Sequence, residues 1–198
     1  SRSLVESYLS ANGLPIHQAE NTQYKGDKWF FDEFADRDPR LYDNIDPAGL
    51  RIEGSGVVAY AATGYFAHLF VNPSLLNVPG GMSSTNITDA PVMKYNEVLM
   101  NYIEAAAELA DMGAYTLTQS DFDKTINAVR NRPSTSMPAV TLAGTNLAVN
   151  GITINDPDRD KGTMIAGDYE VSPILWEVRR ERRTELPYQG IRFNDLRR

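Results

Sequence analysis

Hydrophobic residues recur at helical spacing in several parts of the chain, and the strongest pattern covers residues 92–110. Asp89 and Pro91 are typical of the start of a helix, and Gly113 is typical of its end. We therefore expect one amphipathic helix here. Its inward face would carry Val92, Leu99, Ile103, Ala106 and Ala110, and its outward face Lys94, Glu97, Asn101, Glu104 and Glu108.

A second helix is predicted shortly after the first. Ser120 can cap its N-terminus, and Asp123 occupies the position of the acidic partner in a capping box. Residues 131–133, Asn-Arg-Pro, mark its end. Two amphipathic helices with about nine residues between them form a helical hairpin, the unit of tetratricopeptide-like arrays. The apolar positions of the second helix are Phe122, Ile126 and Val129.

Turn-forming residues dominate two other regions. Residues 1–88 are rich in Gly, Pro, Asn and Asp, which favours loops and short segments, with one short helix near Leu4 to Leu9. Residues 133–172 are similar, and Asn150-Gly151 predicts a small β-hairpin. The expected fold is mainly α, with a loop-rich region and little β. Its parts would be residues 1–88, the helical hairpin 89–132, the loop and β-hairpin 133–172, and the terminal helix 173–198.

The terminal helix begins at Ser172-Pro173 and concentrates the arginines of the chain. In projection Arg182 falls within the apolar stripe, and Glu185, three residues later, can pair with it. Arg180 and Arg183 project away from that stripe. This pattern predicts an internal ion-pair frame rather than a catalytic pair, because the two acids of a glycoside hydrolase must flank an open cleft.

Composition narrows the function classes. The 198 residues carry a net charge of −7, while residues 173–198 alone carry +3. An acidic chain is poorly suited to general binding of nucleic acid, which requires an excess of Lys and Arg over a whole face. The absence of cysteine excludes disulfides, thiolate metal sites and cysteine nucleophiles from these residues. No stretch approaches the roughly 18 to 20 apolar residues of a membrane-spanning helix.

Two local patterns bear on metal binding and catalysis. Asp156, Asp158 and Asp160 have the spacing of a calcium loop. The glycine comes one place late, however, and Gly167 stands where the twelfth-position acid belongs, so an exposed turn is favoured. The two histidines of the chain have neither metal-binding nor triad spacing, so no catalytic residue and no cofactor is expected.

Aromatic residues in the polar segment TQYKGDKWFFDEF are the candidates for ligand binding. Aromatic side chains line many ligand sites, and loops often carry the binding residues. We therefore expect Tyr24, Trp29 and Phe30 to bind ligand. The alternative is that Trp29 and Phe30 anchor this loop on the core.

The C-terminal run RRERRTELPYQGIRFNDLRR resembles the signature of SusD/RagB proteins, an ERR-x-EL-x-x-E-G-x-R-x-x-D-L-x-R pattern. Lys94, Asn96, Pro187 and Gln189 depart from the family pattern. Together with this run, the matching stretches span residues 3–197. The four others, in the family's order, are SLVESYLSANGLPI, FADRDPRLYDNI, DAPVMKYNEVLMNYIEAAAEL and INAVRNR.

This resemblance implies a non-enzymatic, mostly helical lipoprotein on the outer-membrane surface of Bacteroidetes. Such proteins capture glycans and pass them to a SusC-like TonB-dependent transporter. The resemblance also implies that these residues are the C-terminal part of a longer protein, whose lipid anchor and further helix pairs lie elsewhere. The alternative is a helical scaffold that binds peptides or proteins, as tetratricopeptide-like grooves do.

Overall fold

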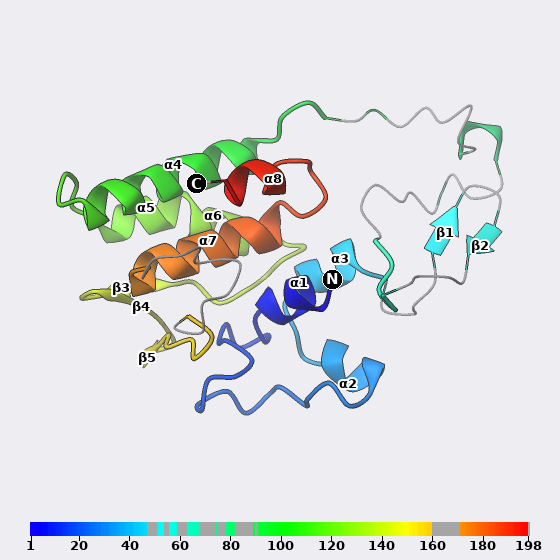
Figure 1. The fold of residues 1–198 in the computed structure, drawn as a ribbon, viewed down its shortest axis with the longest axis horizontal. Coiled ribbons are helices and arrows are strands. Elements are labelled where there is room, and N and C mark those ends of the chain that lie inside the picture. The colour runs from blue at the N-terminus through cyan, green and yellow to red at the C-terminus, as the bar shows by residue number, and fades with distance from the viewer. Residues whose placement is uncertain are drawn as a thin grey trace.

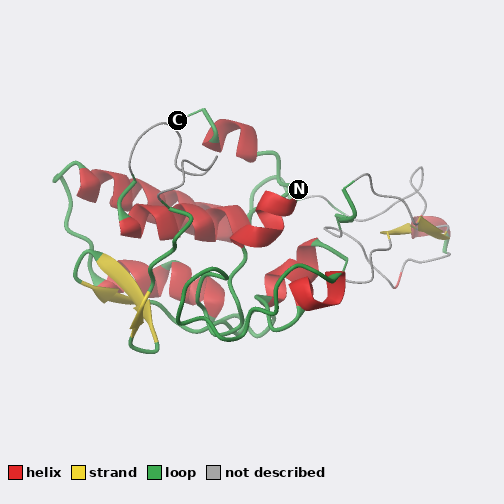
Figure 2. Ribbon diagram, turned by 60° about the horizontal axis from the view of Figure 1, so that its bottom comes forward, coloured by secondary structure: helices red, strands yellow, loops and turns green. Residues whose placement is uncertain are grey.

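A computed structural model describes residues 1–46, 51–53, 56–58, 63–67, 74, 78–81, 89, 91–159 and 171–197. The fold is mainly helical, as predicted. Four helices, α4 to α7, lie side by side and form the main body (Figure 1). Three short helices, α1 to α3, gather beside one end of α7, and the pair β1–β2 lies beyond them (Figure 1). Figure 2 shows the same arrangement from a second direction, with the small sheet at the opposite end of the main body.

Helix α4 (Tyr95–Asp111) packs along α7 (Pro173–Glu185) and against α6 (Ile126–Arg130). Its buried face includes Ile103 and Ala106, as predicted. Gly113, with a φ of 71°, ends the helix as expected. The amide of Ala114 reaches back to the Leu109 carbonyl at 2.8 Å, which is the backbone bond of a Schellman end. The main core contains Met100, Ile103, Phe122, Ile126, Val129, Leu147, Leu175, Trp176 and Val178 among its residues.

The predicted start of α4 is wrong. The helix begins at Tyr95 instead of residue 92, Lys94 rather than Asp89 precedes it, and Val92 is fully exposed. The Asn96 side chain donates to Glu185 Oε1 at 2.6 Å, which ties the first turn to α7. The first turn of α4 is thus bonded to a residue far along the chain, and the local capping residues of the sequence do not indicate this contact.

The second helix of the hairpin also differs from expectation. It is divided into α5 (Gln119–Lys124) and α6, because Thr125 leaves helical geometry at φ −121° and ψ −90°. The cap is Thr118, two residues before the predicted Ser120. Its amide donates to Asp121 at 2.8 Å, so that Asp121 and not Asp123 completes the capping box. Phe122, Ile126 and Val129 are buried as predicted.

Short strands cover one end of this helical body. Strands β3 (Thr141–Ala143), β4 (Asn146–Val149) and β5 (Ile152–Thr153) form an antiparallel sheet in that order. The predicted hairpin joins β4 and β5, with φ of 50° at Asn150 and 78° at Gly151. Such positive values are those of a type I′ turn. A separate pair, β1 (Arg51–Glu53) and β2 (Gly56–Val58), is also antiparallel.

The N-terminal residues build a second, smaller core. Helices α1 (Arg2–Ser7), α2 (Phe30–Phe34) and α3 (Pro39–Asn44) surround it. Helix α1 ends two residues before the predicted Leu9. The three residues of η2 (Pro79–Gly81) form a 3₁₀ turn, and α8 (Arg192–Asp195) follows α7 as a separate short helix. The second core consists of Val5, Tyr8, Phe34, Leu41 and Ile45, with Leu4, Phe30, Tyr42 and Tyr65 packed against it.

Candidate functional site

Helix α7 is buried on every side although it is densely charged. Ten of its thirteen residues are buried, including both Arg180 and Arg183, which are 3% and 8% exposed. The expectation that these two arginines point into solvent is therefore wrong. A helical projection finds one apolar stripe, but it cannot show that α1, α3, α4 and β4 enclose the helix from several directions.

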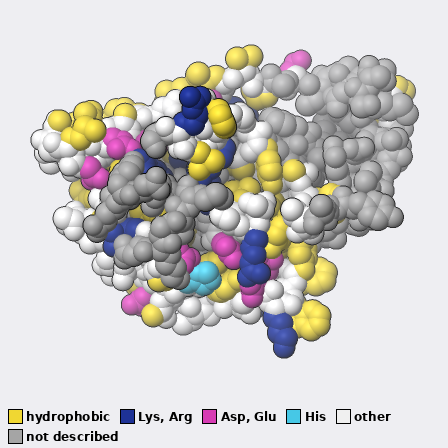
Figure 3. All heavy atoms as spheres, in the orientation of Figure 1, with side chains coloured by type: hydrophobic (Ala, Val, Ile, Leu, Met, Phe, Trp, Pro, Cys, Tyr) yellow, Lys and Arg dark blue, Asp and Glu magenta, His cyan; other side chains and the backbone are white. Residues whose placement is uncertain are grey.

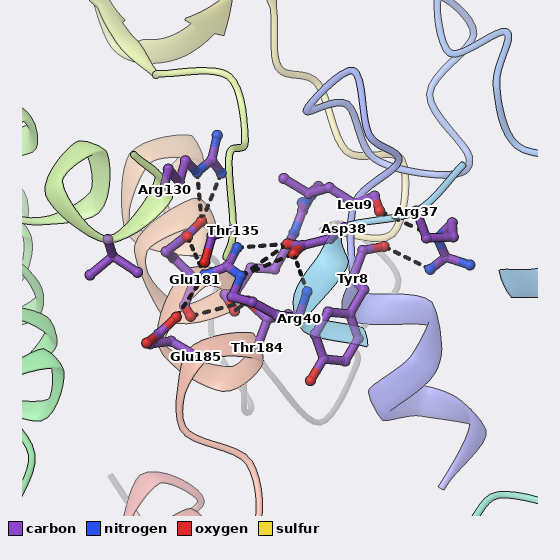
Figure 4. Close-up of polar contacts among 12 residues, drawn as sticks. Tyr8, Leu9, Arg37, Asp38, Arg40, Arg130, Thr135, Glu181, Thr184 and Glu185 are labelled. Carbon is purple, nitrogen blue, oxygen red and sulfur yellow. Dashed lines mark hydrogen bonds and ion pairs between the residues drawn. The ribbon is translucent and has the colours of Figure 1, made fainter. Parts of the chain in front are cut away.

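Glu181 and Glu185 on α7 are the centre of a buried ion-pair network (Figure 4). Arg40 Nη1 donates to Glu181 at 2.7 Å and to Glu185 at 3.0 Å. Arg130 Nη2 donates to Glu181 at 2.7 Å, and Arg132 Nη2 donates to Glu185 at 2.8 Å. The arginines come from α3, from the end of α6 and from the residues just after it. The two carboxylates thus hold together three segments that are distant in sequence.

The RDPR segment, residues 37–40, joins the smaller core to this network. Arg37 donates to backbone carbonyls of Val5 at 2.7 Å, Tyr8 at 2.8 Å and Glu33 at 2.7 Å. Asp38 caps α3 by accepting from the Arg40 amide at 3.0 Å. Because Arg40 then extends from the same short helix to α7, this segment fixes the position of α1 to α3 relative to the main body.

Arg182 is buried, as predicted. The predicted pairing with Glu185 is wrong, because Arg182 contacts other residues. Its Nη1 donates to Asn101 at 2.6 Å, and its Nε lies 3.1 Å from Asp195 and 3.4 Å from Glu104. Glu104, which the helical projection placed on the outward face, is buried against α7. Arg182 therefore joins α4, α7 and α8.

Arg180 binds two carboxylates, Asp156 and Glu177, each at 2.5 Å. Arg183 donates to Ser3 Oγ at 2.9 Å and lines a cavity of about 190 Å³ with residues of α1. Burial, together with the charge of Arg192, lowers the pKa of Arg183 to about 10. These arginines act as internal links between segments.

The pKa values of two glutamates of α7 are shifted in opposite directions. Burial alone would raise the pKa of Glu181, but the charges and hydrogen bonds of Arg130 and Arg40 hold it down to about 2. Burial raises the pKa of Glu177 to about 7, because Arg180 offsets it only in part. The Glu181 carboxylate is thus stabilised as an anion, whereas burial disfavours ionisation of the Glu177 carboxylate until the pH approaches 7.

Stability is expected to fall on both sides of about pH 5. Below the ordinary glutamate pKa of 4.5, protonation of Glu181 removes stability progressively as the pH falls toward 2. Above 4.5, ionisation of Glu177 removes stability as the pH rises through 7. Each effect is on the order of 3 kcal/mol. Melting temperatures measured between about pH 3 and about pH 8 should show this maximum, and a flat profile would contradict it.

The predicted ligand residues lie in and just before α2, with different exposures. The Trp29 side chain is 66% exposed. Phe30 packs inward, with its ring centroid 4.6 Å from that of Phe34 and 6.3 Å from that of Tyr65. Tyr24 is half-buried, with the Arg37 guanidinium 5.3 Å from its ring centroid. Of the two residues in the alternative interpretation, Phe30 anchors the segment and Trp29 does not.

Phe31 is an exposed aromatic residue that the sequence analysis missed. It is 77% exposed and follows Phe30, whose ring meets it edge to face at 6.0 Å. Helical geometry indicates that Phe30 and Phe31 cannot both face the core, because successive residues of a helix point in directions about 100° apart. With Phe30 turned toward the core, its neighbour in the helix points elsewhere.

A separate groove lies between α3, α4, α6 and α7. Its volume is about 570 Å³, within the range of small-ligand sites. Tyr95 contributes an aromatic ring to the lining, while Glu185 and Arg132 contribute charges that already belong to the ion-pair network. The Lys94 side chain also lines this groove.

The aspartates with calcium-loop spacing have other partners. Asp156 accepts from Trp176 Nε1 at 2.7 Å and from Arg180. Asp158 lies 2.8 Å from His17 Nδ1. Asp160 lies outside the described residues. Within the residues that the structure describes, no group of three or more His, Cys, Asp or Glu side chains is placed to hold a metal ion.

Comparison with protein families gives a match to the SusD family model over residues 53–198. The chain belongs to the SusD family. A solved SusD-like carbohydrate-binding protein from Bacteroides fragilis is similar at 27% identity, with a TM-score of 0.57. The alignment covers 99% of this chain but 34% of that protein, so the chain spans about a third of its length. A comparison with curated proteins gives no significant match.

Family membership gives the buried network a structural context. The SusD-family run at residues 179–198 contains Glu181, Arg182 and Glu185, which connect α7 to α3, α4 and α6. Proteins of this family are typically associated with the outer membrane and are generally non-catalytic. Among helices of the described residues, none combines the length and apolar character needed to cross a membrane.

Proposed function

We propose that this SusD-family protein captures glycans at the outer-membrane surface and delivers them to a SusC-like TonB-dependent transporter. Family membership and the likeness to a carbohydrate-binding protein support this function. The protein would act without catalysis. Its buried carboxylates Glu181 and Glu185 are both paired with arginines. Glu185 lines the groove beside α4 but Glu181 does not, so the two are not placed as an acid pair across a cleft, which agrees with such a role.

The proposed glycan-binding surface is the segment that carries Tyr24, Trp29 and Phe30. The exposed Trp29 ring would stack on a sugar, and Phe31 would extend the aromatic surface. Phe30, packed on Phe34, would hold these rings in place. Tyr24 would contribute its partly exposed edge. Exposed rings on a packed anchor offer a large contact area with little conformational entropy to lose on binding.

Trp29→Ala should weaken glycan binding by roughly tenfold or more, because it removes the largest exposed ring of this surface. Calorimetry against a broad panel of oligosaccharides would measure the affinity. Tryptophan fluorescence adds a direct test, because Trp176 is buried and Trp29 alone among the two is accessible to acrylamide. A bound glycan should therefore protect the protein from quenching.

Phe193→Ala is a suitable control, because Phe193 is exposed to a similar degree in the distant helix α8. Its glycan affinity should equal that of the unmodified protein. Equal losses for Trp29→Ala and Phe193→Ala would contradict the proposed surface. Absence of heat with every oligosaccharide would contradict glycan capture itself.

A helical scaffold that binds peptides is the second candidate function. The groove of about 570 Å³ between α3, α4, α6 and α7 favours it, because Tyr95, Lys94 and Asn96 line a space between helices. A ligand that protects Tyr95 and leaves Trp29 accessible to quencher would support this alternative.

A further inference from the structure

A small cavity lies between α1, α7 and the loops around residues 15–17 and 156–158. Its volume is about 190 Å³, which is below the range of drug-sized ligands but ample for a group of a few atoms. The described lining of this cavity shares no residue with the groove beside α4. His17 belongs to the lining, and Figure 3 shows a histidine side chain in cyan at the surface, with acidic side chains in magenta next to it.

Arg183 is the unusual residue of this cavity, because it is buried without a counter-charge. It is 8% exposed, and its Nη2 donates to the Ser3 hydroxyl at 2.9 Å. Since Ser3 also lines the cavity, the guanidinium lies at the cavity wall. A guanidinium has five N–H donors, and within the described part of the chain Arg183 makes no other hydrogen bond and no ion pair. Most of its donors are therefore available to a ligand.

Arg180, three residues earlier on the same helix, shows what Arg183 lacks. Arg180 is also buried, and it binds the carboxylates of Asp156 and Glu177, each at 2.5 Å. Removing a guanidinium from water is costly unless an anion balances its charge, and the Ser3 hydroxyl is neutral. Burial and a neighbouring arginine lower the pKa of Arg183 to about 10. An anion bound in the cavity would oppose both effects.

The acidic side chains of the cavity wall do not supply this missing charge. Each of the three lies beside another residue, at 2.5 to 2.8 Å. A group that enters the cavity therefore meets the Arg183 guanidinium in addition to these pairs. The pairs are Glu6 with Arg2, Asp156 with Arg180, and Asp158 with His17.

We propose that this cavity binds one small oxyanion group, a carboxylate or a phosphate, through the guanidinium of Arg183. The planar fork of an arginine matches both groups and can donate two parallel hydrogen bonds to either. Ile16 and Trp176 contribute apolar surface to the wall, and a wall that excludes water strengthens the attraction between the two charges. The group can belong to a free anion or to an acidic sugar, because the chemistry at Arg183 is the same.

Calorimetry of the protein with inorganic phosphate, glucuronate and glucose tests this site, at constant ionic strength and about pH 8, where an ordinary histidine is mostly uncharged. At least one of the two anions should bind, and glucose should not. Binding of phosphate alone would assign the cavity to a free anion, and binding of glucuronate would assign it to an acidic sugar. In NMR spectra the indole N–H signal of Trp176, which lines the cavity, should shift on binding, and that of the exposed Trp29 should not.

Arg183→Gln should weaken binding of the anion by about tenfold or more. Lys124→Gln is the matched control, because it removes the same charge from an exposed position on α5, outside the cavity, and should keep the affinity. The anion should raise the melting temperature of the unmodified protein but not that of Arg183→Gln. Asp158→Asn is a second variant that leaves Arg183 in place. It removes a negative charge from the cavity wall and should strengthen binding severalfold.

Several outcomes would overturn the proposal. Neither anion might bind, or glucose might bind as well as they do, and both results exclude an oxyanion site. Equal losses for Arg183→Gln and Lys124→Gln would reveal only a general effect of charge. If Arg183→Gln does not fold, an unchanged affinity of Asp158→Asn, or a Trp176 signal that does not move, would place the anion elsewhere. None of these measurements uses the aromatic segment, so they are independent of the proposed glycan capture.

Discussion

Glu181→Gln is expected to lower the free energy of unfolding by about 3–5 kcal/mol. Glu181 is buried and accepts from Arg40 at 2.7 Å and from Arg130 at 2.7 and 3.1 Å. Glutamine keeps the shape but removes the charge, and its amide group places a donor against the donors of an arginine. Two buried guanidinium groups would lose their shared counter-charge. Urea unfolding followed by circular dichroism would measure the change.

Glu177→Gln is the matched control on the same helix. Glu177 is equally buried, but its pKa of about 7 shows that the anion is disfavoured there. Arg180 keeps Asp156 as a partner when Glu177 is neutral. This variant should therefore be as stable as the unmodified protein near pH 5, and more stable above about pH 7. Equal destabilisation by the two substitutions would contradict the opposite roles assigned to these carboxylates.

The sequence predicted that α7 is a structural ion-pair helix, but it did not predict the partners. Periodicity correctly placed Arg182 inside, because its projection depends only on the helix itself. The same method placed Arg180 and Arg183 outside. Their burial depends on α1, on the loop that carries Asp156, and on other segments that meet α7 only in the folded chain. A projection of one helix contains no information about how many neighbours surround it.

Helix ends were predicted correctly where capping residues close in sequence determine them. Ser172 accepts from the Leu175 amide at 3.2 Å, and Gly113 ends α4, both as expected. The start of α4 was predicted wrongly, and there Asn96 is bonded to Glu185, far along the chain. Thr118 was overlooked as a cap because Ser120 offered the same chemistry two residues later. Sequence alone gives no measure of which of two adequate caps is used.

The aromatic segment was found in the sequence because its rings stand among polar residues. Which ring faces outward could not be decided, since that depends on the second core. Phe30 turns inward because Phe34 and Tyr65 offer it aromatic contacts. The RDPR segment, residues 37–40, was recognised only through family resemblance, and the burial of its arginines was not predicted. The hydrogen bond from Arg40 to Glu181 joins residues more than a hundred positions apart, and no local sequence pattern indicates it.

Arg40→Met is expected to have an effect as large as that of Glu181→Gln, about 3–5 kcal/mol. The guanidinium of Arg40 is buried and serves three carboxylates, those of Asp38, Glu181 and Glu185. Methionine fills much of the volume, so the loss reports the charge rather than a cavity. Because α3 is tied to α7 through this side chain, hydrogen exchange of α3 amides should rise more than that of α4 amides.

Arg2→Met provides the comparison, because Arg2 pairs with Glu6 at 2.7 Å but lies on the surface. Water and salt screen such a pair, so this change should barely alter the melting temperature. The double variant with Arg40→Met and Glu181→Gln should be less destabilised than the sum of the two single variants, because the two groups interact directly. Strict additivity would mean that the 2.7 Å contact contributes no coupling, and the network would then not act as one structural unit.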